Sequence, residues 1–172
     1  KTEATNREYR EFVHYIRDSI AHRLLSHFTS DNAIDWKQPV DWKDKRLDGL
    51  MVAAEESNFG KREIDPGKII YAVDFFGRTE TISIYPDTLI WIRDFKFSNN
   101  EPLVKNYFAY ADYDKYPVVG VTLKQALAFC QWKTQQLRRS LKIDEAAKVE
   151  VTLPTNSEWE SAAFDIKDTT FL

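Results

Sequence analysis

Three threonines, each followed three positions later by glutamate or glutamine, constrain this chain more than any other feature. They are Thr5 with Glu8, Thr122 with Gln125, and Thr155 with Glu158. In such a capping box, the two side chains bond backbone N–H groups that the first turn of a helix leaves unpaired. The sequence therefore predicts three helices and sets the residue at which each begins.

Apolar residues recur every three or four positions after each box, which is the period of an amphipathic helix. The first stripe consists of Tyr9, Phe12, Val13, Ile16, Ile20 and Leu24. The second carries Ala126, Phe129, Cys130 and Leu137, and the third Trp159, Ala162 and Ala163. We expect the first helix over about residues 6–25.

The predicted strands are short. Residues 28–81 are rich in turn signals and show no sustained period. Period two sets in over residues 82–97, where residues 85–87 turn the chain into a predicted strand that ends at residue 97, after a shorter strand at residues 82–84. Residues 118–121 and 149–153 predict two further short strands. The expected fold class is α+β, with short, irregular strands, two main helices and many loops.

Composition excludes several kinds of protein. With 43% hydrophobic and 14% aromatic residues among 172, the chain can bury a core, so it is a folded domain. A net charge of -3 gives no electrostatic case for a nucleic-acid partner. The single cysteine, Cys130, excludes an internal disulfide and any multi-cysteine metal site within this chain.

Three segments, residues 1–12, 116–132 and 151–163, carry the most specific sequence patterns of the chain. In their order along the chain they resemble the motifs of the sulfatase-modifying-factor family, whose enzymes generate formylglycine, although Leu123, Thr152 and Asn156 depart from those motifs. The resemblance implies an irregular fold related to C-type lectins, with Trp132 and Trp159 as apolar anchors. We expect residues 1–172 to form one incomplete domain of this family, with a family-specific insertion at about residues 28–81.

The remaining sequence is similar to one branch of this family. Residues 15–21, 85–95 and 100–108 resemble the GldK/PorK lipoproteins of gliding motility and type IX secretion, with GldJ a close second. That resemblance implies a periplasmic scaffold, attached to the outer membrane through a lipid anchor upstream of this chain. It also implies a ring in which several copies assemble with a GldN/PorN-type periplasmic protein.

The same resemblance argues against catalysis by this chain. Enzymes of the family bind copper through a pair of cysteines late in the domain, whereas Cys130 lies on an apolar helical stripe and reads as a packing residue. His14, His22 and His27 lack the spacing of four that places two metal ligands on one helical face. We therefore expect no catalytic residue, cofactor or metal ligand here. Two alternatives stay open: an oxidoreductase whose cysteines lie downstream, and a lectin-like ligand-binding module.

Aromatic density marks the candidate partner-binding residues. They are Trp36, Trp42, Tyr107, Phe108, Tyr110 and Tyr113. Tryptophans in a polar loop either pin the loop to the body of the protein or contact a partner, because aromatic side chains concentrate binding energy. We take contact with a partner protein as the hypothesis for all six.

Overall fold

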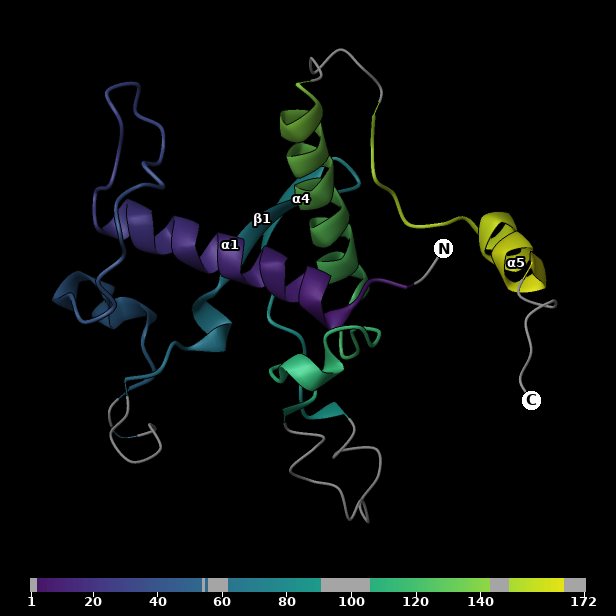
Figure 1. Ribbon diagram of the computed structural model, residues 1–172, viewed down its shortest axis with the longest axis horizontal. Coiled ribbons are helices and arrows are strands. Elements are labelled where there is room, and N and C mark those ends of the chain that lie inside the picture. Colours follow the sequence, from purple (N-terminus) through teal and green to yellow (C-terminus); the bar gives the residue numbers. More distant parts are fainter. Residues whose placement is uncertain (1–2, 54, 56–61, 91–105, 143–148, 166–172) are drawn as a thin grey trace.

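The computed structural model describes residues 3–53, 55, 62–90, 106–142 and 149–165. Two long helices, α1 (Asn6–Leu24) and α4 (Leu123–Leu141), cross near the middle of the molecule, and a two-stranded antiparallel sheet packs beside α4 (Figure 1). Most of the remaining described chain is loop. The fold is thus mixed α+β with few helices, which confirms the predicted class.

Both long helices begin where the capping boxes predict. The Thr5 hydroxyl accepts from the Glu8 N–H at 3.3 Å, and the Glu8 carboxylate accepts from the Thr5 N–H at 3.0 Å. Thr122 and Gln125 form the same reciprocal pair at the start of α4. These bonds satisfy the free donors of the first turn, so each threonine fixes where its helix starts.

Four shorter elements are also described. They are the 3-10 helices η1 (Lys45–Leu50), η3 (Pro66–Lys68) and η4 (Ala111–Tyr113), and the helix α5 (Asn156–Asp165). The third capping box holds the start of α5, where the Thr155 N–H donates to Glu158 at 2.8 Å. α5 lies apart from the other elements (Figure 1). Its Trp159 is 66% exposed. Trp159 is therefore not the apolar anchor that the sequence predicted.

The sheet consists of β1 (Ile70–Phe75) and β2 (Arg78–Ser83), joined by a two-residue turn. The sequence reading missed β1, which falls in the stretch taken to be without a period. Both turn residues, Phe76 and Gly77, have a left-handed backbone, with φ of 51° and 78°. That geometry belongs to a tight hairpin turn whose usual sequence signal is Asn-Gly. Phenylalanine at the first position gave no such signal.

The short strand predicted at residues 82–84 is confirmed for residues 82 and 83, which end β2. The longer strand predicted after it is wrong at its start: the chain turns at Asp87, whose carboxylate accepts from the Leu89 N–H at 3.0 Å, and residues 89 and 90 are not strand. Residues 91–97 lie outside the described ranges.

The two shorter predicted strands are also absent, since the backbone groups of these segments bond to other partners. Gly120, with φ of 73°, accepts from the Asp87 N–H at 2.8 Å, while the Val118 N–H donates to Ala4. Val149 accepts from the Arg138 side chain, and the Val151 N–H donates to the Thr134 hydroxyl. Residues 118–121 and 149–153 are therefore extended loops, each tied to several neighbours rather than to one strand.

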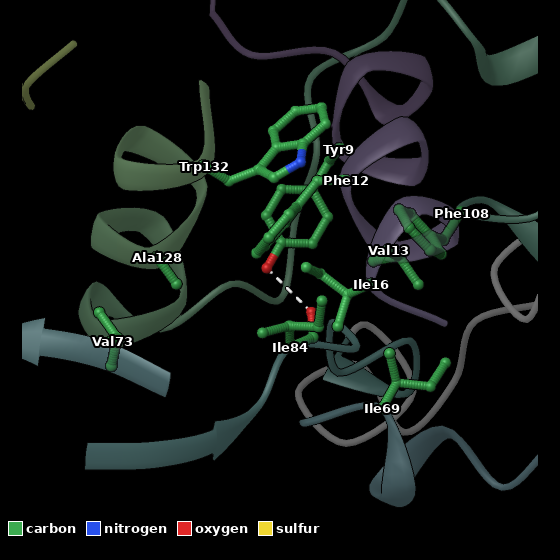
Figure 2. Packing of buried hydrophobic residues seen from close by; sticks show 10 residues of the cluster. All are labelled: Tyr9, Phe12, Val13, Ile16, Ile69, Val73, Ile84, Phe108, Ala128 and Trp132. Atoms are coloured by element: carbon green, nitrogen blue, oxygen red, sulfur yellow. Dashed lines mark hydrogen bonds between the residues drawn. The ribbon is translucent and has the colours of Figure 1, made fainter. Parts of the chain in front are cut away.

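The main core lies between α1, α4 and the hairpin (Figure 2). The rings of Phe12 and Trp132 are 5.2 Å apart, and Trp132 is 5% exposed, so this tryptophan is the anchor that the sequence predicted. The Tyr9 hydroxyl donates to the Ile84 carbonyl at 2.9 Å (Figure 2). Burial raises the pKa of Tyr9 well above its ordinary value, so the hydroxyl stays protonated and keeps this bond.

A second cluster packs under the C-terminal end of α1. It contains Ala21, Leu25, Leu47, Leu50 and Met51. Because these residues come from α1 and from the segment around η1, the cluster ties the start of the predicted insertion to the first helix.

The left-handed backbone of Phe76 leads us to predict that a substitution at this position stabilises the fold. A left-handed backbone costs an L-residue with a Cβ on the order of 1 kcal/mol, and asparagine tolerates it best. Phe76→Asn should therefore raise the free energy of unfolding by about 0.5–1 kcal/mol in urea titrations. Phe76→Ala, which removes the same ring but keeps the unfavourable backbone, is the matched control and should give no such gain. Equal stability of Phe76→Asn and the wild type would contradict the argument.

Candidate partner-binding surface

The six predicted partner-binding residues lie in two separate places along α1. Trp36 and Trp42 belong to the loop that follows α1 and returns to its C-terminal half. Tyr107, Phe108, Tyr110 and Tyr113 belong to a segment that packs against the first turns of α1. The structure therefore does not combine the six residues into one continuous site.

The two tryptophans differ in how deeply they are packed. Trp42 is half-buried, with the Arg17 guanidinium 5.1 Å from its ring centre, and it packs against the second cluster. Trp36 stacks on Tyr15 at 4.9 Å and meets His22 edge-on at 5.1 Å, yet 46% of it stays exposed. Trp42 thus pins the loop, whereas Trp36 pins it and still leaves nearly half of its surface exposed to a partner.

Asn6 and Arg10 hold the second group in place. Asn6 is fully buried, and its side-chain amide donates to the carbonyls of Tyr113 at 3.0 Å and Tyr107 at 3.4 Å. Arg10 donates to the Phe108 carbonyl at 2.7 Å and forms an ion pair with Asp114. Residues more than 95 positions apart in the chain are therefore locked together by side-chain bonds to backbone.

Backbone bonds add to this attachment. The N–H groups of Asn6 and Arg7 donate to the carbonyls of Tyr116 and Asp114 at 2.9 Å and 3.1 Å. These donors belong to the first turn of α1, which has no partner for them within the helix. The segment that carries the tyrosines therefore completes the start of α1.

Four tyrosines of this segment form what we call the tyrosine surface: Tyr107, Tyr110, Tyr113 and Tyr116. The Tyr113 ring lies 5.1 Å from that of Tyr107 and 5.8 Å from that of Tyr116. Tyr110 and Tyr116 are 50% and 55% exposed. The sequence reading did not include Tyr116, although it ends the same aromatic-rich stretch.

Phe108 points the other way. It is 4% exposed and packs edge-on against Tyr9 and Tyr85 at 6.1 Å and 5.4 Å. Such a residue positions its neighbours and has little surface to offer a partner.

The Tyr107 hydroxyl donates to the Pro117 carbonyl at 2.7 Å, and burial raises the pKa of Tyr107, so the hydroxyl stays a donor at neutral pH.

A comparison with known protein families decides the classification. The profile of the sulfatase-modifying factor enzyme 1-like domain matches residues 1–169. The chain belongs to this family. No curated protein and no solved structure matches it.

Within this sulfatase-modifying-factor domain, Cys130 is a packing residue. It lies on α4, is 7% exposed, and its carbonyl accepts from the Thr134 hydroxyl at 2.9 Å. Burial raises the pKa of its thiol, so the reactive thiolate is disfavoured.

His22 and His27 meet at the end of α1, although their spacing of five does not place them on one face of a helix. The Nδ1 atoms of His22 and His27 are 3.2 Å apart, because the chain turns back at the end of α1 and the His27 N–H donates to the His22 carbonyl. One ring nitrogen must donate and the other accept, so the pair forms a hydrogen bond. Within the described ranges, no three His, Cys, Asp or Glu side chains are grouped closely enough to hold a metal ion.

The burial of Cys130 predicts slow labelling. In the folded domain it should react with a thiol-specific disulfide reagent at least about tenfold more slowly than in the urea-unfolded chain, because the thiol is both covered and protonated. The absorbance of the released thiolate follows the reaction at neutral pH. Equal rates in the folded and unfolded states would show that the thiol is accessible and would contradict a packing role.

Proposed function

We propose that this domain is a non-catalytic structural component of the type IX secretion and gliding machinery. In this proposal it faces the periplasm, is attached to the outer membrane through a lipid anchor upstream of this chain, and oligomerises in a ring with a GldN/PorN-type protein. The proposal extends the family membership by means of the branch-specific sequence segments and the exposed surface described above.

One contact indicates why a branch-specific segment is part of the fold. Asp87, in the segment that resembles the GldK/PorK lipoproteins, donates its N–H to the Gly120 carbonyl of the general family motif at 2.8 Å. A Cβ on Gly120 would lie 2.2 Å from the Asp87 carbonyl oxygen, so only glycine allows this approach. This supports a structural role for the segment, since it packs against a defining motif of the domain.

The observation that carries the proposal is the tyrosine surface. Its exposed rings stand on a backbone that Asn6 and Arg10 bond directly, so a partner would meet them already ordered. Large aromatic side chains with a polar tip are enriched at protein interfaces, and rigid ones lose little entropy on binding. A preorganised aromatic surface suits a protein that works by assembly.

Mass measurement tests the proposal. The domain and a GldN/PorN-type protein should elute together in size exclusion, with a mass by light scattering well above that of either alone. Two separate monomer peaks over a wide concentration range would sink the assembly proposal, and copper-dependent thiol oxidation and glycan binding would then become the assays of choice.

Mutation of the tyrosine surface locates the contact. Tyr110→Ala combined with Tyr116→Ala should weaken the complex at least about tenfold, because exposed aromatic anchors dominate binding energy. Leu141→Ala is the control, since Leu141 is 57% exposed at the far end of α4, and it should leave the affinity within about twofold. An unchanged affinity in the double variant would place the interface elsewhere, with Trp36 as the next residue to test.

A further inference from the structure

Along β2, successive residues point their backbone N–H and C=O groups alternately toward β1 and away from it. Phe75 pairs with Arg78 across the turn, so the residues that bond within the hairpin are Arg78, Glu80 and Ile82 on β2. The Ile84 N–H donates to Ile69 at 3.0 Å, which continues the same alternation. Thr79 and Thr81 therefore direct their N–H and C=O groups away from β1.

Glutamine side chains cover other parts of both edges. On β1, the Gln131 side chain accepts from the Asp74 N–H at 3.1 Å and donates to the Asp74 carbonyl at 2.7 Å. On β2, the Gln125 amide donates to the Ser83 carbonyl at 3.1 Å. The outward groups of Thr79 and Thr81 have no partner among the described residues, and both side chains are exposed. An uncovered edge of this kind is a template for another strand.

The hairpin tip adds a second and independent observation. Phe76 is 86% exposed and is held in a left-handed backbone conformation. Exposure of the ring is unfavourable because water solvates an aromatic side chain poorly. The left-handed conformation is unfavourable because the Cβ crowds the backbone. Backbone strain and solvent exposure at the same residue indicate that Phe76 serves a function other than folding, such as contact with another protein chain.

We infer that β2 pairs antiparallel with β2 of a second copy of this chain, about a two-fold axis at Thr79. In that register Arg78 lies opposite the partner's Glu80, and Glu80 opposite the partner's Arg78. The two Thr79 residues exchange their outward N–H and C=O bonds, and Phe76 falls opposite the partner's Ile82. The result is a four-stranded sheet in which the open edge of each β2 strand is paired.

Charge complementarity favours a second copy of this chain as the strand that pairs with β2, and it favours this register over the neighbouring ones. Glu80 uses one carboxylate oxygen to bind Lys124 at 2.5 Å, and its other oxygen has no partner among the described residues. Shifting the axis to Glu80 would oppose the two glutamates directly, which is unfavourable. Shifting it to Thr81 would place Glu80 opposite the partner's Ile82 and Arg78 opposite the partner's Ile84, so both charge pairs would be lost.

This pairing is independent of the proposed function. A two-fold contact uses the same patch on both copies and closes on itself, so it forms a pair and not a ring. Growth of a ring would need another surface, such as the tyrosine surface. The association tested below involves only this chain, so its failure would not bear on binding of a GldN/PorN-type protein.

A charge-swap experiment tests both the contact and its register. Sedimentation equilibrium of the wild-type chain, at protein concentrations up to the order of 100 µM, should show a reversible monomer–dimer equilibrium, as expected for a small interface. Arg78→Glu alone and Glu80→Arg alone should each weaken it about tenfold or more, since each places like charges opposite one another twice. Mixing the two variants should restore dimers, now between unlike chains.

Phe76→Asn distinguishes association from stability. This variant should dimerise several-fold more weakly than the wild type while unfolding at a higher urea concentration, an outcome that general damage to the hairpin would not produce. A wild-type chain that stays monomeric throughout, or single charge variants that dimerise as well as the wild type, would overturn the inference. So would a mixture of the two charge variants that stays monomeric.

Discussion

The hydrogen bonds from the Asn6 side chain join the beginning of the chain to a segment more than 100 residues away, and the rest of the structure depends on this junction. Asn6 is fully buried, and its amide donates to the carbonyls of Tyr107 and Tyr113. One turn later, Tyr9 donates to the Ile84 carbonyl in the centre of the core. The first two turns of α1 therefore organise segments that have little regular structure of their own beyond the short helix η4.

Side-chain hydrogen bonds to backbone groups hold loops in place in other parts of the domain as well. Gln125 binds the carbonyls of Ser83 and Tyr85, Gln131 binds the backbone of Asp74, and Thr134 binds the N–H of Val151. All three donor or acceptor side chains lie on α4. Backbone groups of loops must find partners when they are covered, and two helices supply those partners where a larger sheet would otherwise do so. This explains how a family domain with one two-stranded sheet in its described part can still hold exposed aromatic loops in fixed positions.

The sequence predicted the helices and the core well because their signals are local. The threonine capping boxes mark where the helices begin, and the first apolar stripe is buried from Tyr9 to Ile16, although Leu24 at its end is 42% exposed. Of the second stripe, Cys130 is buried, while Ala126, Phe129 and Leu137 are half-buried. The hairpin escaped prediction because Phe76 occupies a turn position that usually signals itself through asparagine. Residues 118–121 were wrongly predicted as a strand, since hydrophobicity alone does not show that Gly120 bonds to Asp87 instead of to a neighbouring strand.

The candidate surface was harder to predict, because it depends on contacts between distant segments. Aromatic density selected Phe108 and left out Tyr116, but tertiary packing buries the first and exposes the second. Likewise, the pairing of His22 with His27 follows from the turn that ends α1 and not from helical spacing. Partner binding by the aromatic residues and assembly in a secretion machinery stay proposals that rest on sequence resemblance and on the ordered, exposed tyrosines.

The most direct test of this account is the stability of Asn6→Ala. If Asn6 joins the start of α1 to the tyrosine segment, its removal leaves the Tyr107 carbonyl without its donor and leaves the Tyr113 carbonyl with only the Tyr116 N–H. Together with the space left in a fully buried site, this should lower the free energy of unfolding by about 2 kcal/mol or more in urea titrations. Amide hydrogen exchange should also accelerate in the segment that carries Tyr113 and Tyr116, because the segment opens locally. A variant within about 0.5 kcal/mol of the wild type, with unchanged exchange in that segment, would contradict the central role given to this junction.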